Sequence, residues 1–122
     1  MDTLIIQATA QTPLINLNSA TGIMEIKGRS IPDDPEAFWG SVLTWFDNYM
    51  KNPSDETLVK IDLEYFNITS SKRILFLLYK LNELVDSGKK AKVEWYYRQS
   101  DEDMYEVGQD YAFMVRVPFD FR

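Results

Sequence analysis

Three consecutive hydroxyl residues, Thr69, Ser70 and Ser71, carry the chemistry that stands out in this chain, and Lys72 and Arg73 follow them directly. They lie where an alternating strand pattern gives way to a helical one, which places them at the start of a helix. A phosphate of charge about −2 at this point would meet free helix N–H groups, the positive end of the helix dipole and cationic side chains. One of the hydroxyls could instead serve only as the helix N-cap, which stabilises a helix by about 1 kcal/mol.

The elements on either side of the hydroxyls are predicted by their apolar spacing. Before them, residues 57–65 alternate in period two, which predicts a strand whose buried face is made by Val59, Ile61, Leu63 and Tyr65. After them, apolar residues recur at helical spacing, at Ile74, Leu77, Leu78, Leu81 and Val85. Ser87-Gly88 then provides a helix stop. The sequence therefore predicts a strand that delivers the hydroxyls to a helix N-terminus.

Leu75, Phe76 and Tyr79 lie outside that helical stripe and make the predicted helix apolar around its side. Two interpretations fit these residues. The first is deep burial between the sheet and the preceding helix. The second is a strip that docks a partner beside the hydroxyls, because exposed aromatic and aliphatic groups commonly mark interfaces.

Two further clusters have simpler explanations. The acidic residues near the C-terminus follow no EF-hand spacing, so a solvated helix face is favoured over a divalent-cation site; they are Asp101, Glu102, Asp103, Glu106 and Asp110. The run Trp95-Tyr96-Tyr97 could form a stacking platform for bases. Trp95 and Tyr97 fall on the apolar side of a predicted strand, however, which favours core packing.

Composition excludes several classes of chemistry. The chain has no cysteine and no histidine, which removes thiol nucleophiles, disulfides, thiolate metal sites and imidazole acid–base catalysis. It has no glycine-rich phosphate loop, catalytic triad or metal motif, and nothing focuses a carboxylate pair such as Asp62 and Glu64 in a pocket. A net charge of −6 disfavours nucleic acid and anionic membrane surfaces as partners. We therefore expect a protein that is not an enzyme and that needs no cofactor or metal.

The length predicts one domain over residues 1–122. No apolar run approaches the roughly 18 residues of a membrane span, and the N-terminus lacks the basic and apolar regions of a signal peptide. We therefore expect a cytoplasmic protein without membrane insertion.

The remaining patterns predict a mixed α/β fold. In chain order they indicate a short strand at Leu4–Ala8, a hairpin of Leu14–Asn18 with Ile23–Lys27, a helix at Glu36–Met50 capped by Asp33 or Asp34, the strand and helix described above, a strand at Ala91–Tyr97, a short helix with Ser100 as candidate cap and Gly108 within it or at its end, and an edge strand or tail at Val115–Phe121. Helical crossovers imply parallel pairing beside the antiparallel hairpin. We expect two layers: a mixed sheet of about 4–6 strands, with helices mainly on one face.

Several short motifs, in this order, resemble the SiaC family of bacterial regulatory phosphoproteins. They are Thr12-Pro13, Gly28-x-Ser30-x-Pro32, Trp45, Tyr65-Phe66-Asn67-x-Thr69-Ser70-Ser71-Lys72, Trp95-Tyr96-Tyr97, Asp101-Glu102-Asp103, Glu106-x-Gly108-x-Asp110-Tyr111 and Pro118-Phe119. The resemblance covers nearly the whole chain. It implies a STAS-like domain, similar to the anti-sigma-factor antagonists.

The resemblance also implies a function. In that family a Thr in an Asn-Thr-Ser-Ser motif is phosphorylated by a dedicated kinase, of the histidine-kinase-like ATPase type, and dephosphorylated by a PP2C-type phosphatase. The unphosphorylated form binds and activates a GGDEF diguanylate cyclase, which raises cyclic di-GMP and favours biofilm growth. The resemblance therefore implies a partner-switching signalling protein that catalyses nothing itself.

One departure from the family motif bears on the phosphate acceptor. With Asn67 and Lys72 aligned without a gap, the family's Thr falls on Ile68, which has no hydroxyl. We predict phosphorylation on Thr69, with Ser70 as second choice, and partner contacts from the surrounding residues Asn67, Ile68, Ser71, Lys72, Leu75, Phe76 and Tyr79. The alternative is a constitutive protein-interaction domain or an anti-sigma-factor antagonist that phosphorylation does not regulate.

Overall fold

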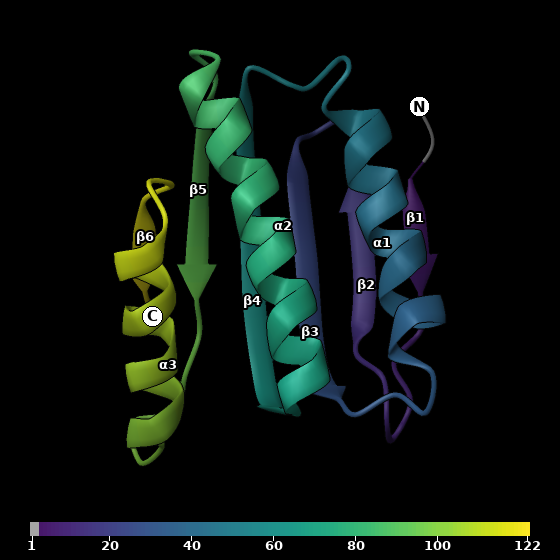
Figure 1. The fold of residues 1–122 in the computed structure, drawn as a ribbon, viewed down its shortest axis with the longest axis vertical. Coiled ribbons are helices and arrows are strands. Elements are labelled where there is room, and N and C mark those ends of the chain that lie inside the picture. The colour runs from purple at the N-terminus through teal and green to yellow at the C-terminus, as the bar shows by residue number, and fades with distance from the viewer. Residues whose placement is uncertain (1–2) are drawn as a thin grey trace.

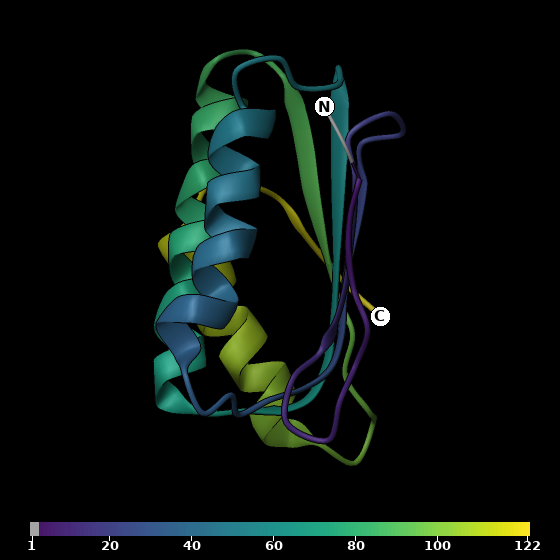
Figure 2. The same cartoon turned by 90° about the vertical axis from the view of Figure 1, so that its right-hand side faces the viewer.

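The computed structural model describes residues 3–122, which form a six-stranded sheet with three helices packed on one face (Figure 1). The elements are β1 (Leu4–Ile6), β2 (Leu14–Asn18), β3 (Ile23–Ser30), α1 (Pro35–Tyr49), β4 (Glu56–Phe66), α2 (Ile68–Asp86), β5 (Lys90–Trp95), α3 (Glu102–Met114) and β6 (Phe119–Phe121). Figure 2, turned by 90°, shows the sheet edge-on with these helices on the same side. The structure confirms the two-layer α/β fold and the mixed sheet.

The strands lie side by side in chain order, from β1 to β6. The β1–β2 and β2–β3 pairs are antiparallel, and the β3–β4, β4–β5 and β5–β6 pairs are parallel. From β3 onward, each helix connects one strand to the next parallel strand in the same direction across the sheet. Because such crossovers in proteins are almost always right-handed, α1, α2 and α3 cover the same face of the sheet. The predicted hairpin is confirmed, and its second strand continues to Ser30.

The core fills the space between the sheet and the helices. The side chain of Asp34 accepts a hydrogen bond from the backbone N–H of Ala37 at 3.1 Å, so Asp34 is the N-cap, one of the two predicted. Pro35 is the first residue of α1, one residue before the predicted start. From this helix Trp39 and Phe46 are fully buried against the sheet.

Within residues 3–122, none of the helices combines the length and the apolar character needed to cross a membrane.

The alternation of β4 breaks near its end. Its predicted inward-facing residues are buried up to Leu63. Tyr65, however, is 52% exposed, so its predicted place on the buried face is wrong. The register shifts here, since Leu63 is paired with Gly28 and Tyr65 with the next residue of β3, Arg29. The extra residue on β4 forms a bulge, which reverses the facing of the residues after it. Phe66 consequently packs against the core.

Helix α3 extends further than predicted. Asp101, not Ser100, caps the helix by accepting a hydrogen bond from the backbone N–H of Met104 at 3.0 Å. Gly108 lies within the helix, one of its two predicted positions, and contacts Trp95, where a Cβ added to it would come within 2.5 Å of the indole ring. The indole N–H of Trp95 also donates to the carbonyl oxygen of Met104 at 3.0 Å. The glycine therefore permits the close approach of α3 to β5.

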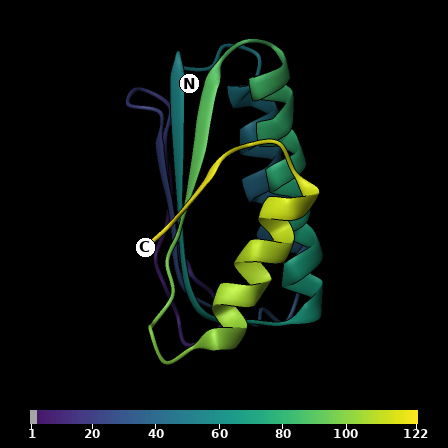
Figure 3. The ribbon, with the colours of Figure 1, turned by 90° about the vertical axis from the view of Figure 1, so that its left-hand side faces the viewer.

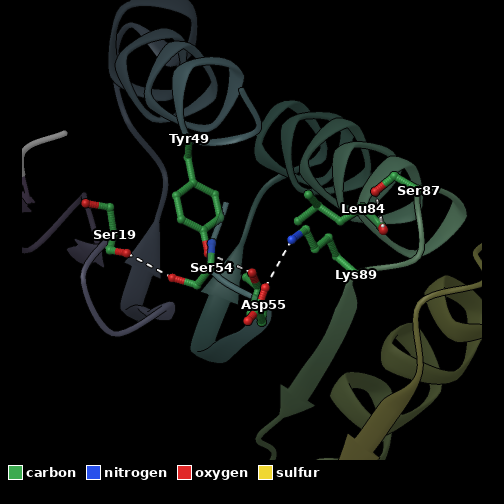
Figure 4. Close-up of polar contacts among 8 residues, drawn as sticks. Ser19, Tyr49, Ser54, Asp55, Leu84, Ser87 and Lys89 are labelled. Carbon is green, nitrogen blue, oxygen red and sulfur yellow. Dashed lines mark hydrogen bonds and ion pairs between the residues drawn. The ribbon is translucent and has the colours of Figure 1, made fainter. Parts of the chain in front are cut away.

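At the end of the sheet away from the hydroxyls, polar contacts tie the connecting loops together (Figure 4). The hydroxyl of Ser54 donates to the carbonyl oxygen of Ser19 at 3.0 Å, and the backbone N–H of Ser54 donates to the hydroxyl of Tyr49 at 3.2 Å. The ammonium of Lys89 lies 3.1 Å from the carboxylate of Asp55. These contacts join the β2–β3, α1–β4 and α2–β5 connections, while the candidate site lies at the other end, where β4 leads into α2.

Candidate functional site

The candidate site is the connection from β4 into α2, which we name the hydroxyl turn (Asn67–Ser71). The side chain of Asn67 accepts a hydrogen bond from the backbone N–H of Ser70 at 2.9 Å, so Asn67 is the N-cap and α2 begins at Ile68. The interpretation of one of the hydroxyls as the N-cap is therefore wrong, and all three lie inside the first turn of the helix. The signal that could have shown this is Asn67 itself, because asparagine caps helices as well as serine does.

Ser70 points into the molecule and is fully buried. Its hydroxyl lies 2.8 Å from the hydroxyl of Ser30 and donates to the carbonyl oxygen of Ser30 at 3.0 Å. The indole N–H of Trp39 donates to the hydroxyl of Ser30 at 3.2 Å. The hydroxyl of Ser70 thus belongs to a buried network that joins β3, α1 and α2.

Ser71 is half-buried and joins α2 to α3. Its hydroxyl lies 2.7 Å from the hydroxyl of Tyr111, which donates to the carbonyl oxygen of Ser71 at 3.0 Å. Burial raises the pKa of Tyr111, and the hydrogen bond with Ser71 acts in the opposite direction. The hydroxyl of Ser71 is therefore also engaged in holding two elements together.

Thr69 is the exposed residue among the three hydroxyls. It is the second residue of α2, where backbone N–H groups have no carbonyl partner within the helix. Ile68, the first residue, is 80% exposed and presents an apolar side chain beside it. One step along a helix turns the side-chain direction by about 100°, so the two residues face different ways. Of the three hydroxyl residues, Thr69 is therefore the one that a partner can reach from solvent.

The two cations after the turn differ in how free they are. Lys72 is exposed and lies about one helical turn from Thr69. The guanidinium of Arg73 lies 3.6 Å from the carboxylate of Glu36, a contact that ties α2 to α1. An anion on Thr69 would therefore find Lys72 as its accessible charge partner.

One exposed stripe of α2 runs from the hydroxyl turn along the helix. Its members are three or four residues apart, and they are Thr69, Lys72, Phe76, Tyr79 and Glu83. Phe76 is 47% exposed and Tyr79 is 44% exposed, so the interpretation of deep burial is wrong for both, whereas Leu75 is half-buried against the core. An exposed hydroxyl and two exposed aromatic rings thus share one face of the helix.

The two rings line a hollow between α2 and the end of α3, helices that Figure 3 shows on the same side of the sheet. This α2–α3 hollow has a volume of about 460 Å³, and its other lining residues are Lys80, Asn82, Glu83, Met114 and Arg116. The side-chain oxygen of Asn82 accepts hydrogen bonds from the backbone N–H groups of Arg116 and Val117 at 2.8 and 3.0 Å, which holds the segment after α3 against α2.

Sequence reasoning missed two exposed apolar residues at the end of α3, of which Met114 lines this hollow. Met114 is 54% exposed and Phe113 is 93% exposed. Their spacing of three and four residues from Asp110 places them on the same side of α3 as the predicted solvated face, and that spacing could have revealed them.

Asp62 and Glu64, the carboxylate pair that the sequence analysis did not place in a pocket, both line a second hollow of about 620 Å³, so that expectation is wrong. Glu64 is exposed, and the guanidinium of Arg98 lies 3.4 Å from it. A carboxylic acid that acts as a proton donor in an enzyme typically lies in a buried site, whereas Glu64 is exposed and paired with Arg98. Within residues 3–122, no three acidic side chains come together as metal ligands.

Comparison with known proteins gives a match over nearly the whole chain. A family model described as SiaC family regulatory phosphoprotein matches residues 6–122. An uncharacterised protein of Pseudomonas aeruginosa strain UCBPP-PA14 is 24% identical over 119 residues, which are 98% of this chain and 94% of that protein.

Solved structures share the fold. The crystal structure of apo-SiaC from Pseudomonas aeruginosa superposes with a TM-score of 0.94 at 23% identity, covering 100% of this chain and 99% of that chain. A chain in the crystal structure of the diguanylate cyclase SiaD in complex with its activator SiaC, from the same organism, superposes with a TM-score of 0.92 at 24% identity and covers 97% of each chain.

Proposed function

This chain belongs to the SiaC family of regulatory phosphoproteins, as its short motifs indicated, and on that premise we propose that it is a non-enzymatic partner-switching protein. Its unphosphorylated form binds and activates a GGDEF diguanylate cyclase, and phosphorylation of Thr69 interrupts that binding. The output is control of cyclic di-GMP and, through it, of biofilm growth. The protein works in the cytoplasm beside these enzymes.

The observation that carries this proposal is the placement of Thr69 on the exposed stripe of α2. Phe76 follows it by seven residues on the same face, about 10 Å along the helix axis. Ser70 is fully buried and Ser71 is bonded to Tyr111, so each would have to break internal contacts to reach a kinase. These contacts support Thr69 as the acceptor and argue against Ser70.

The switch is electrostatic. A phosphate on Thr69 adds a charge of about −2 at the first turn of α2, where the helix dipole, free N–H groups and Lys72 stabilise it. The same charge lies at the edge of the apolar contact made by Ile68, Phe76 and Tyr79, and a partner would have to strip water from it on docking. Phosphorylation therefore stabilises the free protein and weakens the complex.

Three proteins act on this surface in the proposal. A kinase of the histidine-kinase-like ATPase type adds the phosphate, a PP2C-type phosphatase removes it, and the diguanylate cyclase binds the form without it. A member of the same fold supports the cyclase as the partner, since SiaC of Pseudomonas aeruginosa is described as the activator of the diguanylate cyclase SiaD. The partner contacts lie on Asn67, Ile68, Ser71, Lys72, Leu75, Phe76 and Tyr79.

The test is phosphorylation of the full chain by its cognate kinase with ATP, followed by mass spectrometry of the peptides. We expect one phosphate on Thr69 and its loss in a Thr69→Val variant. Ser70→Ala and Ser71→Ala variants that remain folded should still be phosphorylated. A phosphate on any other residue, or none after treatment with a competent kinase, contradicts the assignment.

The exposed Ile68 favours a second candidate, a constitutive interaction domain or anti-sigma-factor antagonist without phosphorylation. An apolar side chain, 80% exposed at the family's acceptor position, suits a permanent contact better than a switch. Binding to a cyclase that is unchanged by treatment with kinase and ATP would select this candidate. Co-purification of an anti-sigma factor in place of a cyclase would select the antagonist.

A further inference from the structure

We infer that the α2–α3 hollow and the acidic face of α3 form one docking surface, and that it receives a protein segment that is apolar and flanked by lysine or arginine. The inference rests on the proposed function and deepens it, because it states the chemistry that the partner presents to the aromatic rings of α2. The hollow supplies the apolar contact and α3 supplies the charge.

The apolar part is a concentration of exposed side chains. Within residues 3–122, three of the eight large exposed hydrophobic side chains line the hollow, namely Phe76, Tyr79 and Met114. Single exposed apolar groups are normal on a protein surface, whereas a group of them around a hollow is typical of an interaction site. Two of these residues come from α2 and one from the end of α3, so the surface exists only in the folded domain.

The cations at the hollow are already paired. Lys80 is bonded to the carboxylate of Asp47, and Arg116 makes two hydrogen bonds to Asp86, at 2.6 and 3.1 Å. Glu83, by contrast, forms no ion pair with any residue in the described part of the chain. The charge left open at the hollow is therefore negative.

The negative charge continues along α3. Asp103, Glu106 and Asp110 are exposed, follow one another at helical spacing and form no ion pair within residues 3–122. Asp110 precedes Met114 by four residues, so the acidic row leads directly to the hollow. From Asp103 to Met114 the row spans about 16 Å of helix. A segment seated in the hollow and lying along α3 would thus place its cations opposite these carboxylates.

Charge complementarity selects the occupant. An acidic segment would meet like charges along α3, which disfavours it, and nucleic acid is disfavoured for the same reason by the net charge of −6. A purely cationic segment would leave the aromatic rings uncovered. The surface fits a segment that carries both apolar and cationic side chains.

Two synthetic peptides of equal length test this chemistry without any cyclase or kinase. One consists of leucine and lysine and the other of leucine and glutamate, and each is titrated into the ¹⁵N-labelled full chain while NMR amide shifts are followed. We expect the leucine–lysine peptide to shift the amides of α2 and α3 around the hollow, and to bind at least about tenfold more tightly than the other. Added salt should weaken binding of the leucine–lysine peptide, because salt screens the attraction between its lysines and the carboxylates of the chain.

Variants of the chain locate the contact. Met114→Ser should weaken binding of the leucine–lysine peptide about tenfold, and Glu106→Gln combined with Asp110→Asn should remove most of the salt dependence of that binding. Ile5→Ser, which changes a similarly exposed apolar residue on β1, should have no effect. Absence of binding, equal affinity for both peptides, or shifts on the open face of the sheet overturn the inference.

The same variants separate this inference from the proposed function. If Thr69→Asp weakens binding of the cognate cyclase while the α3 variants bind it normally, the docking surface is wrong and the switch stands. If the leucine–lysine peptide binds as expected but no cyclase responds to the chain, the surface stands and the proposed function fails.

Discussion

The hydroxyl of Ser70 lies 2.8 Å from the hydroxyl of Ser30, although the two residues are 40 positions apart and both are fully buried. The pair lies where the start of α2 meets the end of β3, and the indole N–H of Trp39 extends it to α1. The first turn of α2 is therefore anchored from inside the domain. This anchoring explains why, of the three hydroxyl residues in the turn, Thr69 is the exposed one.

The first prediction concerns the stability that this anchor provides. Ser70→Ala leaves the buried hydroxyl of Ser30 with one fewer partner and should lower the free energy of unfolding by about 1–3 kcal/mol. Ser70→Asp should cost more, because it buries a carboxylate. Urea unfolding near neutral pH measures both changes. Thr69→Ala is the matched control and should change stability by less than about 0.5 kcal/mol, since its side chain is exposed. Equal losses at the two positions would show that the Ser30–Ser70 pair does not hold the turn.

The second prediction concerns the glycine in α3. Gly108→Ala places a methyl group within 2.5 Å of the indole of Trp95 and should destabilise the fold by about 1–3 kcal/mol, because α3 must move away from β5. Gly40 lies inside α1 with nothing within 4 Å of an added Cβ. Gly40→Ala should therefore stabilise the protein by about 0.5–1 kcal/mol through helix propensity. Thermal unfolding compares the two variants, and the same sign of change in both would contradict the close packing at Gly108.

The third prediction is a pH dependence. Burial raises the pKa of Tyr111 above its ordinary value of 10.0, so the folded protein holds this proton more tightly than the unfolded chain does. The stability from the neutral phenol is therefore fully present below about pH 10 and is lost as the pH rises through the folded-state pKa. A hydrogen bond to Glu94 raises the pKa of Tyr96 and acts in the same direction.

Tyr111→Phe isolates that contribution. The variant should be less stable than the parent at about pH 8, by roughly 1 kcal/mol, because it loses the hydrogen bonds with Ser71. Between about pH 9 and 11 it should lose less stability than the parent, because its ring cannot ionise. Urea unfolding over this range makes the comparison, with Tyr96 common to both proteins. Parallel pH profiles would contradict the raised pKa of Tyr111.

Apolar periodicity predicted the elements but not the orientation of their polar residues. Apolar residues two apart in β4, and three or four apart in α2, indicate which face of each element meets the core. The buried residues follow this pattern in β4 as far as Leu63 and in α2 from Ile74 onward. Tyr65 departs from the pattern because the bulge arises from register with β3, a long-range pairing that alternation within one strand does not contain. Ser70 is buried by Ser30 and Trp39, which no local pattern connects to it.

The last prediction tests the switch itself with a charge that needs no kinase. Thr69→Asp places a carboxylate at the second residue of α2, where the helix dipole favours it, so the free energy of unfolding should stay the same or rise by about 0.3–1 kcal/mol. Binding of the cognate diguanylate cyclase should nevertheless weaken at least about tenfold, because the charge lies at the edge of the contact proposed for Ile68 and Phe76. Calorimetric titration measures the affinity, and Thr44→Asp, on an exposed position of α1, controls for added charge in general. A stable Thr69→Asp protein that binds the cyclase as tightly as its parent would show that charge on Thr69 does not control docking.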